Sequence, residues 1–333
     1  MSDPVLILVF LTAGSVSLAT SWLLVSRLER IGARLGLSEP LLGLVAALAA
    51  DAPEITAAIT ALLAHQARIG AGVAVGSNVF NLAALLGLSS IIAGRIDLHR
   101  RVIVLQGVVA IAVAALAVAV VAGGLSAAGG LGLSVAILGP YIVVVGLRPG
   151  RLSRLPLPSR WLAWLAEAIH EEEIELQEAI HPSRGRGRDG VLGLAALAAV
   201  IAASVVMEHA ASKLGGRHGV PQILVGALVL AAVTSLPNAV AAIYLALRAR
   251  GSAALSTSLN SNALNVAIGL MLSGTILGLG SPSGQSVLVA SWSLGLTLFT
   301  LAAAYRTRGL RRSHGVVIVG AYLVFVGVLV ASA

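Results

Sequence analysis

The sequence predicts an all-α membrane protein with ten transmembrane helices, arranged as two five-helix repeats of inverted topology. Three observations support this prediction. The 333 residues are 58% hydrophobic and only 11% charged, whereas an average soluble domain is roughly 25% charged. Apolar stretches long enough to cross a bilayer recur along the whole chain, and part of the sequence is repeated 184 residues later. The composition therefore argues against a water-soluble fold.

Ten apolar stretches have the length of a membrane span. A helix of roughly 20 residues crosses about 30 Å of hydrocarbon. The first stretch is too long for the apolar core of a signal peptide and no basic residue precedes it, so we count it as a helix. The predicted spans are residues 4–26, 40–63, 72–93, 102–122, 128–147, 190–210, 220–247, 255–279, 284–304 and 314–332. Residues 1–148 and 190–333 then form the two five-helix repeats, and residues 149–189 link them.

An internal repeat relates the two halves. Residues 43–89 align with residues 227–273 without a gap, and 15 of the 47 paired positions are identical. The matches that carry weight in so apolar a sequence are Pro53 with Pro237, Ser77 with Ser261, Asn78 with Asn262, Asn81 with Asn265, and Ser89 with Ser273. The repeat begins in the second and seventh spans, and an odd displacement of five spans turns one copy upside down. Inverted repeats place a substrate site near the middle of the membrane, at their interface.

The basic residues predict the orientation of the chain. If the N-terminus is outside, 19 of the 22 Lys and Arg lie in cytoplasmic connections and only Arg68, Lys213 and Arg217 lie outside. This asymmetry follows the positive-inside rule. The basic residues that orient the chain in the lipid bilayer account for its net charge of +8, so no nucleic-acid partner is needed to explain this charge. Both termini are expected outside a cell membrane of the bacterial or archaeal inner-membrane type, with the linker in the cytoplasm.

The linker contains a predicted acidic helix at residues 161–181. Glu167, Glu171, Glu175 and Glu178 share one face at helical spacing, while the aromatic and aliphatic residues Trp161, Trp164, Leu165 and Ile169 suit the membrane interface. We favour a solvated acidic helix among basic cytoplasmic loops. A regulatory cation site at His170 and Glu171 to Glu173 is the alternative.

Two acidic residues stand out by their place in the spans. Of the 14 Asp and Glu, only Asp51 and Glu54 fall in the middle of a predicted span, and Glu208 lies near a helix end. A charge at bilayer depth costs several kcal/mol unless it is paired, hydrated or bound to an ion. The spans offer no Lys, Arg or central His as a partner, so a bound cation is the simplest compensation. The chain has no cysteine, which leaves oxygen or histidine as ligands.

Polar side chains with matching positions in both repeats accompany these acids. Pro53 lies between Asp51 and Glu54 and removes one backbone donor, which predicts a helix break rich in oxygen. The corresponding place in the second repeat has Pro237 between hydroxyl and amide side chains. The candidate ligands beside the two acids are Ser77, Asn78, Asn81, Thr234, Ser235, Asn238, Ser261, Asn262 and Asn265. Two carboxylates with several neutral oxygens suit a divalent cation such as Ca²⁺, which takes six to eight oxygen ligands.

A purely structural role for the neutral residues is the alternative. Ser and Asn in membrane helices often only hydrogen-bond neighbouring helices, and proline often only bends a helix. We favour close helix packing for Gly72 and Gly76, because small residues let two backbones approach. A pair of acids rarely serves a structural hydrogen bond, so Asp51 and Glu54 carry the prediction of a cation site.

The paired motifs resemble the alpha repeats of the cation/Ca²⁺ exchanger superfamily, which includes sodium/calcium exchangers. They are ADAPE at residues 50–54 with GVAVGSNVFN at 72–81, and VTSLPN at 233–238 with SLNSNALN at 258–265. The resemblance implies a ten-helix antiporter that uses alternating access and no cofactor. It puts Glu54 and Asn238 in the places of the two liganding glutamates of the family. It also implies that Ser77, Asn81, Ser261 and Asn265 fill ligand positions and that Thr234 and Ser235 supply oxygens.

The sequence departs from the family pattern at two linked positions. Asn238 replaces the second glutamate, and Asp51 stands where the family usually has serine, with Ala50 in place of the neighbouring threonine. The number of central acids stays at two, but both lie in one half of the chain. Two carboxylates this close repel each other, and a proton on one of them would relieve the repulsion. Proton coupling is therefore an alternative to sodium coupling.

The function expected from the sequence is secondary antiport of Ca²⁺ or a similar cation against Na⁺, with H⁺ as the alternative counter-ion. Two rival functions are a passive channel and a transport-impaired cation sensor or scaffold, the second of which is suggested by Asn238. An enzyme is not expected. An intramembrane aspartyl protease needs acids from two helices, and a zinc protease needs an HExxH helix, and the sequence has neither.

Overall fold

The computed structural model describes residues 1–333 except 38, 147–155, 157, 180–186 and 333. In the described part the chain is helical apart from its connections and one short two-stranded ribbon. The elements are α1 (Asp3–Leu35), α2 (Glu39–Ala50), α3 (Ala52–Leu63), α4 (Ala67–Asn81), the π-helix η1 (Leu82–Leu88), α5 (Ser89–Ala93), β1 (Arg95–Asp97), α6 (Arg100–Val121), α7 (Ala127–Gly146), α9 (Ser159–Ala179), α10 (Gly187–Arg217), α11 (Gln222–Leu224), η2 (Val225–Leu230), α12 (Ala231–Thr234), α13 (Leu236–Leu247), α14 (Gly251–Leu264), η3 (Asn265–Leu272), α15 (Ser273–Leu277), α16 (Gly284–Thr307), β2 (Gly309–Arg311) and α17 (Arg312–Ala331).

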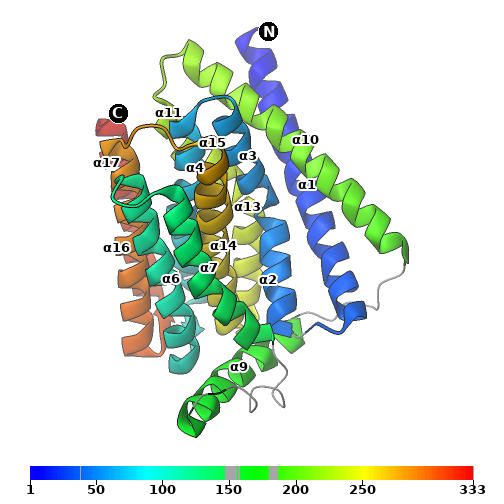
Figure 1. The fold of residues 1–333 in the computed structure, drawn as a ribbon. Helices are drawn as coiled ribbons and strands as arrows, with labels where there is room; N and C mark the ends of the chain where they lie inside the picture. Colours follow the sequence, from blue (N-terminus) through cyan, green and yellow to red (C-terminus); the bar gives the residue numbers. More distant parts are fainter. Residues whose placement is uncertain (38, 147–155, 157, 180–186, 333) are drawn as a thin grey trace.

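The helices form one bundle with distinct ends. Both chain termini lie at one end, which we call the terminal side, and α9 lies across the opposite end, the linker side (Figure 1). At the linker side β1 pairs with β2 in antiparallel register, with Ile96 opposite Leu310. This ribbon joins the connection between α5 and α6 to the connection between α16 and α17.

Seven described helices are long and apolar enough to cross a membrane, and two bent helix pairs raise the number to nine. Nine of the ten predicted spans correspond to these segments. The remaining one, residues 255–279, lies in a continuous helix formed by α14, η3 and α15. It is absent from the nine because side chains such as Asn260, Asn262 and Asn265 lower its hydropathy. The last two of these side chains belong to the candidate site.

Each of the two bent pairs contains one of the predicted proline breaks. The helix axis bends by 49° between α2 and α3, at Asp51, and by 48° between α12 and α13, at Ser235. Because Pro53 has no N–H, the carbonyl of Ala49 four residues earlier loses its helical donor. The hydroxyl of Ser21 in α1 lies 3.4 Å from this carbonyl oxygen and donates to it. The breaks predicted from the two prolines are therefore present, and a neighbouring helix satisfies the first of them.

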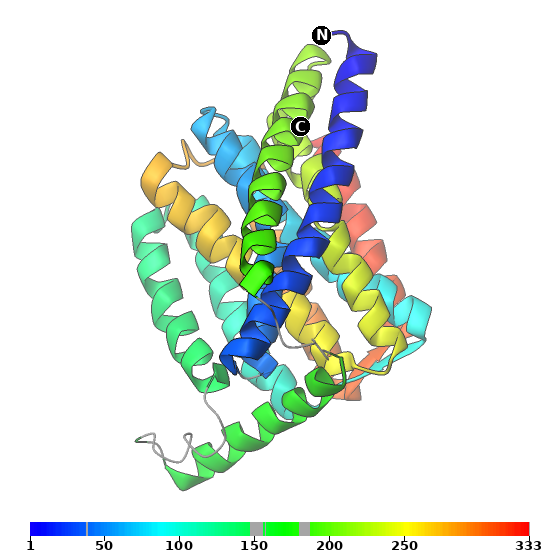
Figure 2. The same ribbon diagram turned by 90° about the vertical axis from the view of Figure 1, so that its right-hand side faces the viewer.

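Helices α1 and α10 form an antiparallel pair along one flank of the bundle (Figure 2). The pair is held near both ends by ion pairs, from Arg217 to Asp3 and from Arg27 to the buried Asp189. Near the middle the hydroxyls of Ser17 and Ser204 are 2.9 Å apart. The first helix of one repeat and the first helix of the other therefore run in opposite directions.

The linker helix α9 packs against α2, α6 and α14. Ala168 and Ile169 are buried there, so Ile169 contacts the protein and not the membrane interface. The carboxylate of Glu167 forms a 2.6 Å ion pair with Arg101. The side chains of residues 171–180 are outside the described part, and so is most of the alternative regulatory cation site at His170 and Glu171 to Glu173.

The close packing expected at Gly72 and Gly76 is present where α4 crosses η2. A Cβ atom added at Gly76 would lie 2.5 Å from the Cα of Ala227, and one at Gly72 would lie 3.0 Å from its backbone nitrogen. Both neighbours are backbone atoms, so no side-chain rotation relieves the contact. The crossing holds the middle of α4 against the broken helix of the second repeat.

We expect Gly76→Ala to destabilise the protein because the added methyl group would push the two backbones apart. Overpacking of this kind costs about 1–3 kcal/mol. Thermal unfolding of the purified protein in detergent would measure the loss. Gly139→Ala is the matched control, since nothing lies within 4 Å of a Cβ at Gly139 in α7. Equal stability of the two variants would contradict the packing argument.

Candidate functional site

The predicted ligands meet where the two helix breaks lie beside α4 and α14. The residues come from four separate stretches of the chain, two in each repeat. All eleven are buried, with at most 7% of any of them exposed: Asp51, Glu54, Ser77, Asn78, Asn81, Thr234, Ser235, Asn238, Ser261, Asn262 and Asn265. The structure therefore gathers the polar residues of both repeats at the centre of the bundle.

Asp51 lies at the first break and is bonded to the second repeat. Its Oδ1 accepts a 2.7 Å hydrogen bond from the amide of Asn238 and a 2.6 Å hydrogen bond from the hydroxyl of Ser261. Asp51 is the residue that precedes the start of α3, and Asn238 lies in the first turn of α13. The two positions that depart from the family pattern thus contact each other directly across the interface.

Glu54 is the other carboxylate at this break. Its Oε1 accepts a 2.9 Å hydrogen bond from the hydroxyl of Ser235, the residue at the second break. Thr234, next to Ser235, is placed differently, because its hydroxyl donates to the carbonyl of Leu230 one turn back in its own helix. Among the described residues no third acid or histidine joins the two carboxylates as a group.

Hydrogen bonds between α4 and α14 follow the internal repeat. The amide of Asn81 donates to the hydroxyl of Ser261 at 3.0 Å, and the amide of Asn265 donates to the hydroxyl of Ser77 at 3.2 Å. A shift of 184 residues exchanges these two bonds, since it maps Asn81 onto Asn265 and Ser77 onto Ser261. The site is therefore close to symmetric between its two halves.

A second pair of bonds maps onto itself under the same shift. The amide of Asn78 donates to the backbone carbonyl of Asn262 at 3.1 Å, and the amide of Asn262 donates to the carbonyl of Asn78 at 3.2 Å. The side-chain oxygen of Asn262 also accepts from Asn81 at 3.0 Å. Asp51 and Glu54 break the symmetry, because Ser235 and Asn238 occupy the equivalent positions.

Six buried oxygens of this cluster have no hydrogen-bond partner in the described part of the chain. Two belong to carboxylates and four to amides: Asp51 Oδ2, Glu54 Oε2, Asn78 Oδ1, Asn81 Oδ1, Asn238 Oδ1 and Asn265 Oδ1. Buried polar groups normally have partners, and unpaired ones carry a desolvation cost. All six atoms are acceptors, so the cluster lacks donors or a cation. Six oxygens with two negative charges suit a hard divalent cation.

A cavity connects the cluster with the linker-side half of the bundle. It has a volume of about 480 Å³ and lies between α1, α2, α13 and α14. Asn238 and Ala50 line its inner end, and Glu29, Ser26 and Tyr244 are among its other lining residues. Asn238 therefore forms part of the wall of a cavity that extends toward the linker side.

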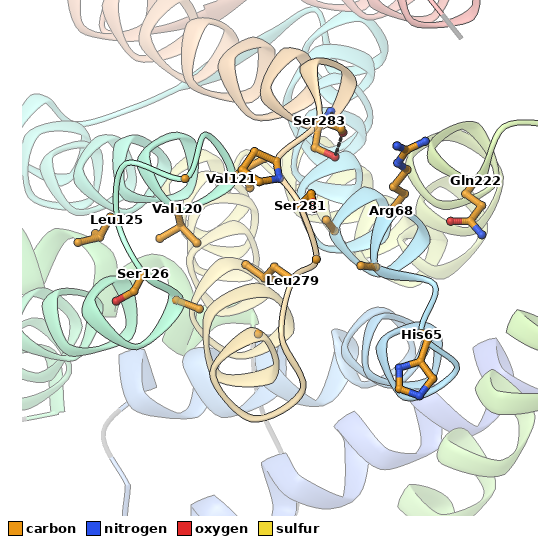
Figure 3. Close-up of a pocket in the computed structure, with 18 residues that line it drawn as sticks. His65, Arg68, Val120, Val121, Leu125, Ser126, Gln222, Leu279, Ser281 and Ser283 are labelled. Atoms are coloured by element: carbon orange, nitrogen blue, oxygen red, sulfur yellow. Dashed lines mark hydrogen bonds between the residues drawn. The ribbon is translucent and has the colours of Figure 1, made fainter.

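A larger pocket of about 620 Å³ lies on the terminal side (Figure 3). His65, Arg68, Gln222 and Ser283 line it, and its lining, which lies in the described part, includes no acidic residue and none of the predicted ligands. The positive charge of Arg68 in this lining disfavours a cation. This pocket is therefore not the cation site.

Sequence reasoning missed Ser21, which completes the first break by donating to the carbonyl of Ala49. It also missed Tyr141, whose hydroxyl donates to the side chain of Asn260 on α14 at 3.1 Å. Ser17, Ser21 and Leu24 lie on the buried face of α1 at a spacing of three or four residues. That spacing was the available signal for Ser21, but it does not indicate the partner.

Comparisons with known proteins agree with the fold. The family model described as sodium/calcium exchanger protein matches residues 5–148 and 190–331. No curated protein sequence matches the chain. The fold is similar to that of the H⁺/Ca²⁺ exchanger CAX, with a TM-score of 0.73 and 13% identity over 98% of this chain and 86% of that one. It is also similar to that of native YfkE, with a TM-score of 0.64 and 16% identity over 97% of this chain and 92% of that one. The fold of the sodium-calcium exchanger NCX_Mj is similar too, with a TM-score of 0.61 and 19% identity over 98% of this chain and 99% of that one.

Proposed function

Since the chain belongs to the sodium/calcium exchanger protein family, we propose that it is a secondary antiporter that exchanges Ca²⁺ or a similar divalent cation for Na⁺. The observation that carries this proposal is the cluster of six buried, unpaired oxygens around Asp51 and Glu54. A divalent cation would neutralise both carboxylates and supply the partner that the oxygens lack. Na⁺ would compete for the same oxygens, and this competition couples the two fluxes.

The proposed ligands are the eleven residues of the cluster, with different roles. Asp51 and Glu54 supply the charge, and Asn78, Asn81, Asn238 and Asn265 supply neutral oxygens. Ser77, Ser235, Ser261 and Asn262 hold these groups in place through the hydrogen bonds described above. Thr234 is the weakest candidate, because its hydroxyl hydrogen is directed at its own helix.

We infer ten transmembrane helices in two repeats of inverted topology. The antiparallel pair α1 and α10, the two bends of nearly equal angle and the exchangeable hydrogen bonds between α4 and α14 support this inference. An inverted pair of repeats, related by a pseudo-two-fold axis in the membrane plane, can exchange conformations around a fixed site, which is the basis of alternating access. The helix from Gly251 to Leu277 is then the tenth span, and its polar residues face the site and not lipid.

The proposed orientation places both termini outside and the linker in the cytoplasm, because 19 of the 22 basic residues lie in the connections on the linker side or within the linker. The cavity that Asn238 lines then lies in the cytoplasmic half.

Exchange of the divalent cation for H⁺ is the second candidate function. The observation that favours it is that both carboxylates belong to one repeat. They accept hydrogen bonds from hydroxyl and amide groups, and none of these bonds comes from a basic side chain. One carboxylate could carry a proton when the divalent cation leaves. The similarity in fold to an H⁺/Ca²⁺ exchanger does not decide between the counter-ions.

Proteoliposomes would test the proposal and separate the two candidates. We expect Ca²⁺ uptake when an opposing Na⁺ gradient is imposed at equal pH on both sides. Uptake driven only by an opposing pH gradient would replace Na⁺ by H⁺ as the counter-ion. Flux down a Ca²⁺ gradient alone, independent of either counter-ion, would identify a channel and overturn antiport.

A further inference from the structure

A third buried acidic residue lies outside the proposed ligand set. Glu208 on α10 is 1% exposed, and neither oxygen of its carboxylate has a hydrogen-bond partner in the described part of the chain. The residues from Val191 to Met207 before it carry no charge. Glu208 is thus the first charged residue after the apolar part of α10, in the half of the helix that lies toward the terminal side. It is turned into the protein although a neighbouring position would have placed it at the surface.

His209 offers a route from Glu208 to water. Its side chain is 63% exposed, and its Nδ1 lies 3.3 Å from Oε2 of Glu208 and 2.8 Å from the carbonyl of Val205. A neutral imidazole whose hydrogen is on Nδ1 can accept a proton from water at Nε2 and pass the Nδ1 hydrogen to the carboxylate, after which a flip of the ring restores the starting tautomer. The two adjacent residues therefore join a buried carboxylate to the terminal-side surface.

The elements packed against α10 offer Glu208 no compensating charge at its level. These elements are α1, α3, η2 and α11. Residues 4–26 of α1 have no titratable group, α3 has only Glu54, and η2 and α11 have none. At the terminal-side ends lie Asp3 of α1 with its partners Arg217 and His218, and also His65, Arg68 and Lys213. A charged Glu208 is therefore buried without a cation beside it other than a protonated His209, and such burial is costly.

The residue before Glu208 lies near the second helix break. Met207, the residue before it, and Val233, which immediately precedes Thr234 and the break, both lie beside Gly14 of α1. A Cβ at Gly14 would lie 3.5 Å from Met207 Sδ and 3.4 Å from Val233 Cγ1. Helices α1, α10 and α12 therefore come together at Met207, one residue before Glu208. A change of charge at Glu208 acts on the packing of the α1 and α10 pair against the break.

We propose that Glu208 is a proton-binding site separate from the central ligands, that it exchanges its proton with terminal-side water through His209, and that its protonation favours close packing of α1 and α10 against the α12 break. The binding of the proton stands on the burial and the contacts of Glu208. The effect on ion exchange rests on the proposed function.

Infrared difference spectroscopy of the full chain in lipid, after a pH jump in Ca²⁺-free buffer, would detect the proton on Glu208. We expect a buried carboxyl band that appears on acidification in the wild type and is lost in Glu208→Gln. Glu167→Gln, which removes a half-exposed acid on α9, should retain the band. In His209→Gln the band should form more slowly, because its exposed proton carrier is gone. An unchanged band in Glu208→Gln overturns the proposal, and an unchanged rate in His209→Gln overturns the route.

Ion uptake tests the consequence for transport. With only the terminal-side pH varied, we expect the uptake rate of the wild type to depend on pH, and Glu208→Gln to show at every pH the rate of the wild type at the acidic end. A Glu208→Gln profile parallel to that of the wild type would overturn control by Glu208. Thermal stabilisation by Ca²⁺, measured on the same samples, reports the central site separately. If the wild type shows no such stabilisation, the proposed function fails while the infrared result for Glu208 stands.

Discussion

Replacement of Glu54 by glutamine is expected to abolish Ca²⁺ uptake in proteoliposomes while the protein still folds. The glutamine side chain has nearly the same shape, and its carbonyl oxygen can still accept the 2.9 Å hydrogen bond from Ser235. It lacks the negative charge that makes a divalent cation stable at this depth. Loss of a group that only orients a metal ligand already costs about 10–100-fold in affinity. We therefore expect a loss of at least about 100-fold in affinity when the ligand itself loses its charge.

The Glu54→Gln prediction has two readouts. Radioactive Ca²⁺ uptake measures transport, and the shift of the thermal unfolding temperature on adding Ca²⁺ measures binding. Glu167→Gln removes the same charge at a half-exposed position on α9 and should behave like the wild type. If Glu54→Gln binds and transports Ca²⁺ normally, the cation site has been assigned to the wrong residues.

The gathering of the candidate site residues was predictable, because the helix breaks follow from local chemistry and the polar pattern occurs in both halves. Pro53 and Pro237 lack a backbone donor wherever they lie, so a break follows from the sequence alone. The 184-residue repeat identified Asn81 and Asn265 as equivalent positions, and their hydrogen bonds to serine confirm that the two copies face each other. The low charge of the chain likewise determined its class without any tertiary information.

The tertiary contacts were not predictable to the same extent. In a chain that is 58% hydrophobic, apolar periodicity does not reveal which face of a helix is buried, since lipid and protein interior favour the same side chains. The bond from Ser21 to Ala49 and the burial of Glu208 depend on how α1 and α10 pack, and no local signal encodes either of them. The polar helix from Gly251 to Leu277 shows that low hydropathy can also hide a helix of the bundle, because a hydropathy criterion alone does not count it among the candidate membrane spans.

Exchange of the side chains at positions 51 and 238 is the second large effect that we expect. Asp51→Asn alone removes one of two charges from the cluster and should lower the affinity for Ca²⁺ by about 10–100-fold, comparable with other losses around a metal site. The double variant Asp51→Asn with Asn238→Asp restores the charge on the other side of a single 2.7 Å hydrogen bond. Because a carboxylate and an amide have the same shape, the pair can keep its bond with donor and acceptor reversed.

The double variant should therefore recover most of the Ca²⁺ affinity that Asp51→Asn loses, and it separates the number of charges from their position. Ca²⁺-dependent thermal stabilisation measures affinity, and uptake against Na⁺ and pH gradients measures coupling. Asn238→Asp alone would place three acids in the cluster and should weaken folding in the absence of Ca²⁺, since like charges at bilayer depth repel strongly. Recovery of affinity without recovery of coupling would mean that the placement of both acids in one repeat determines the counter-ion. A double variant that binds no better than Asp51→Asn would show that Asp51 acts through its own geometry, and that Asn238 is not interchangeable with it.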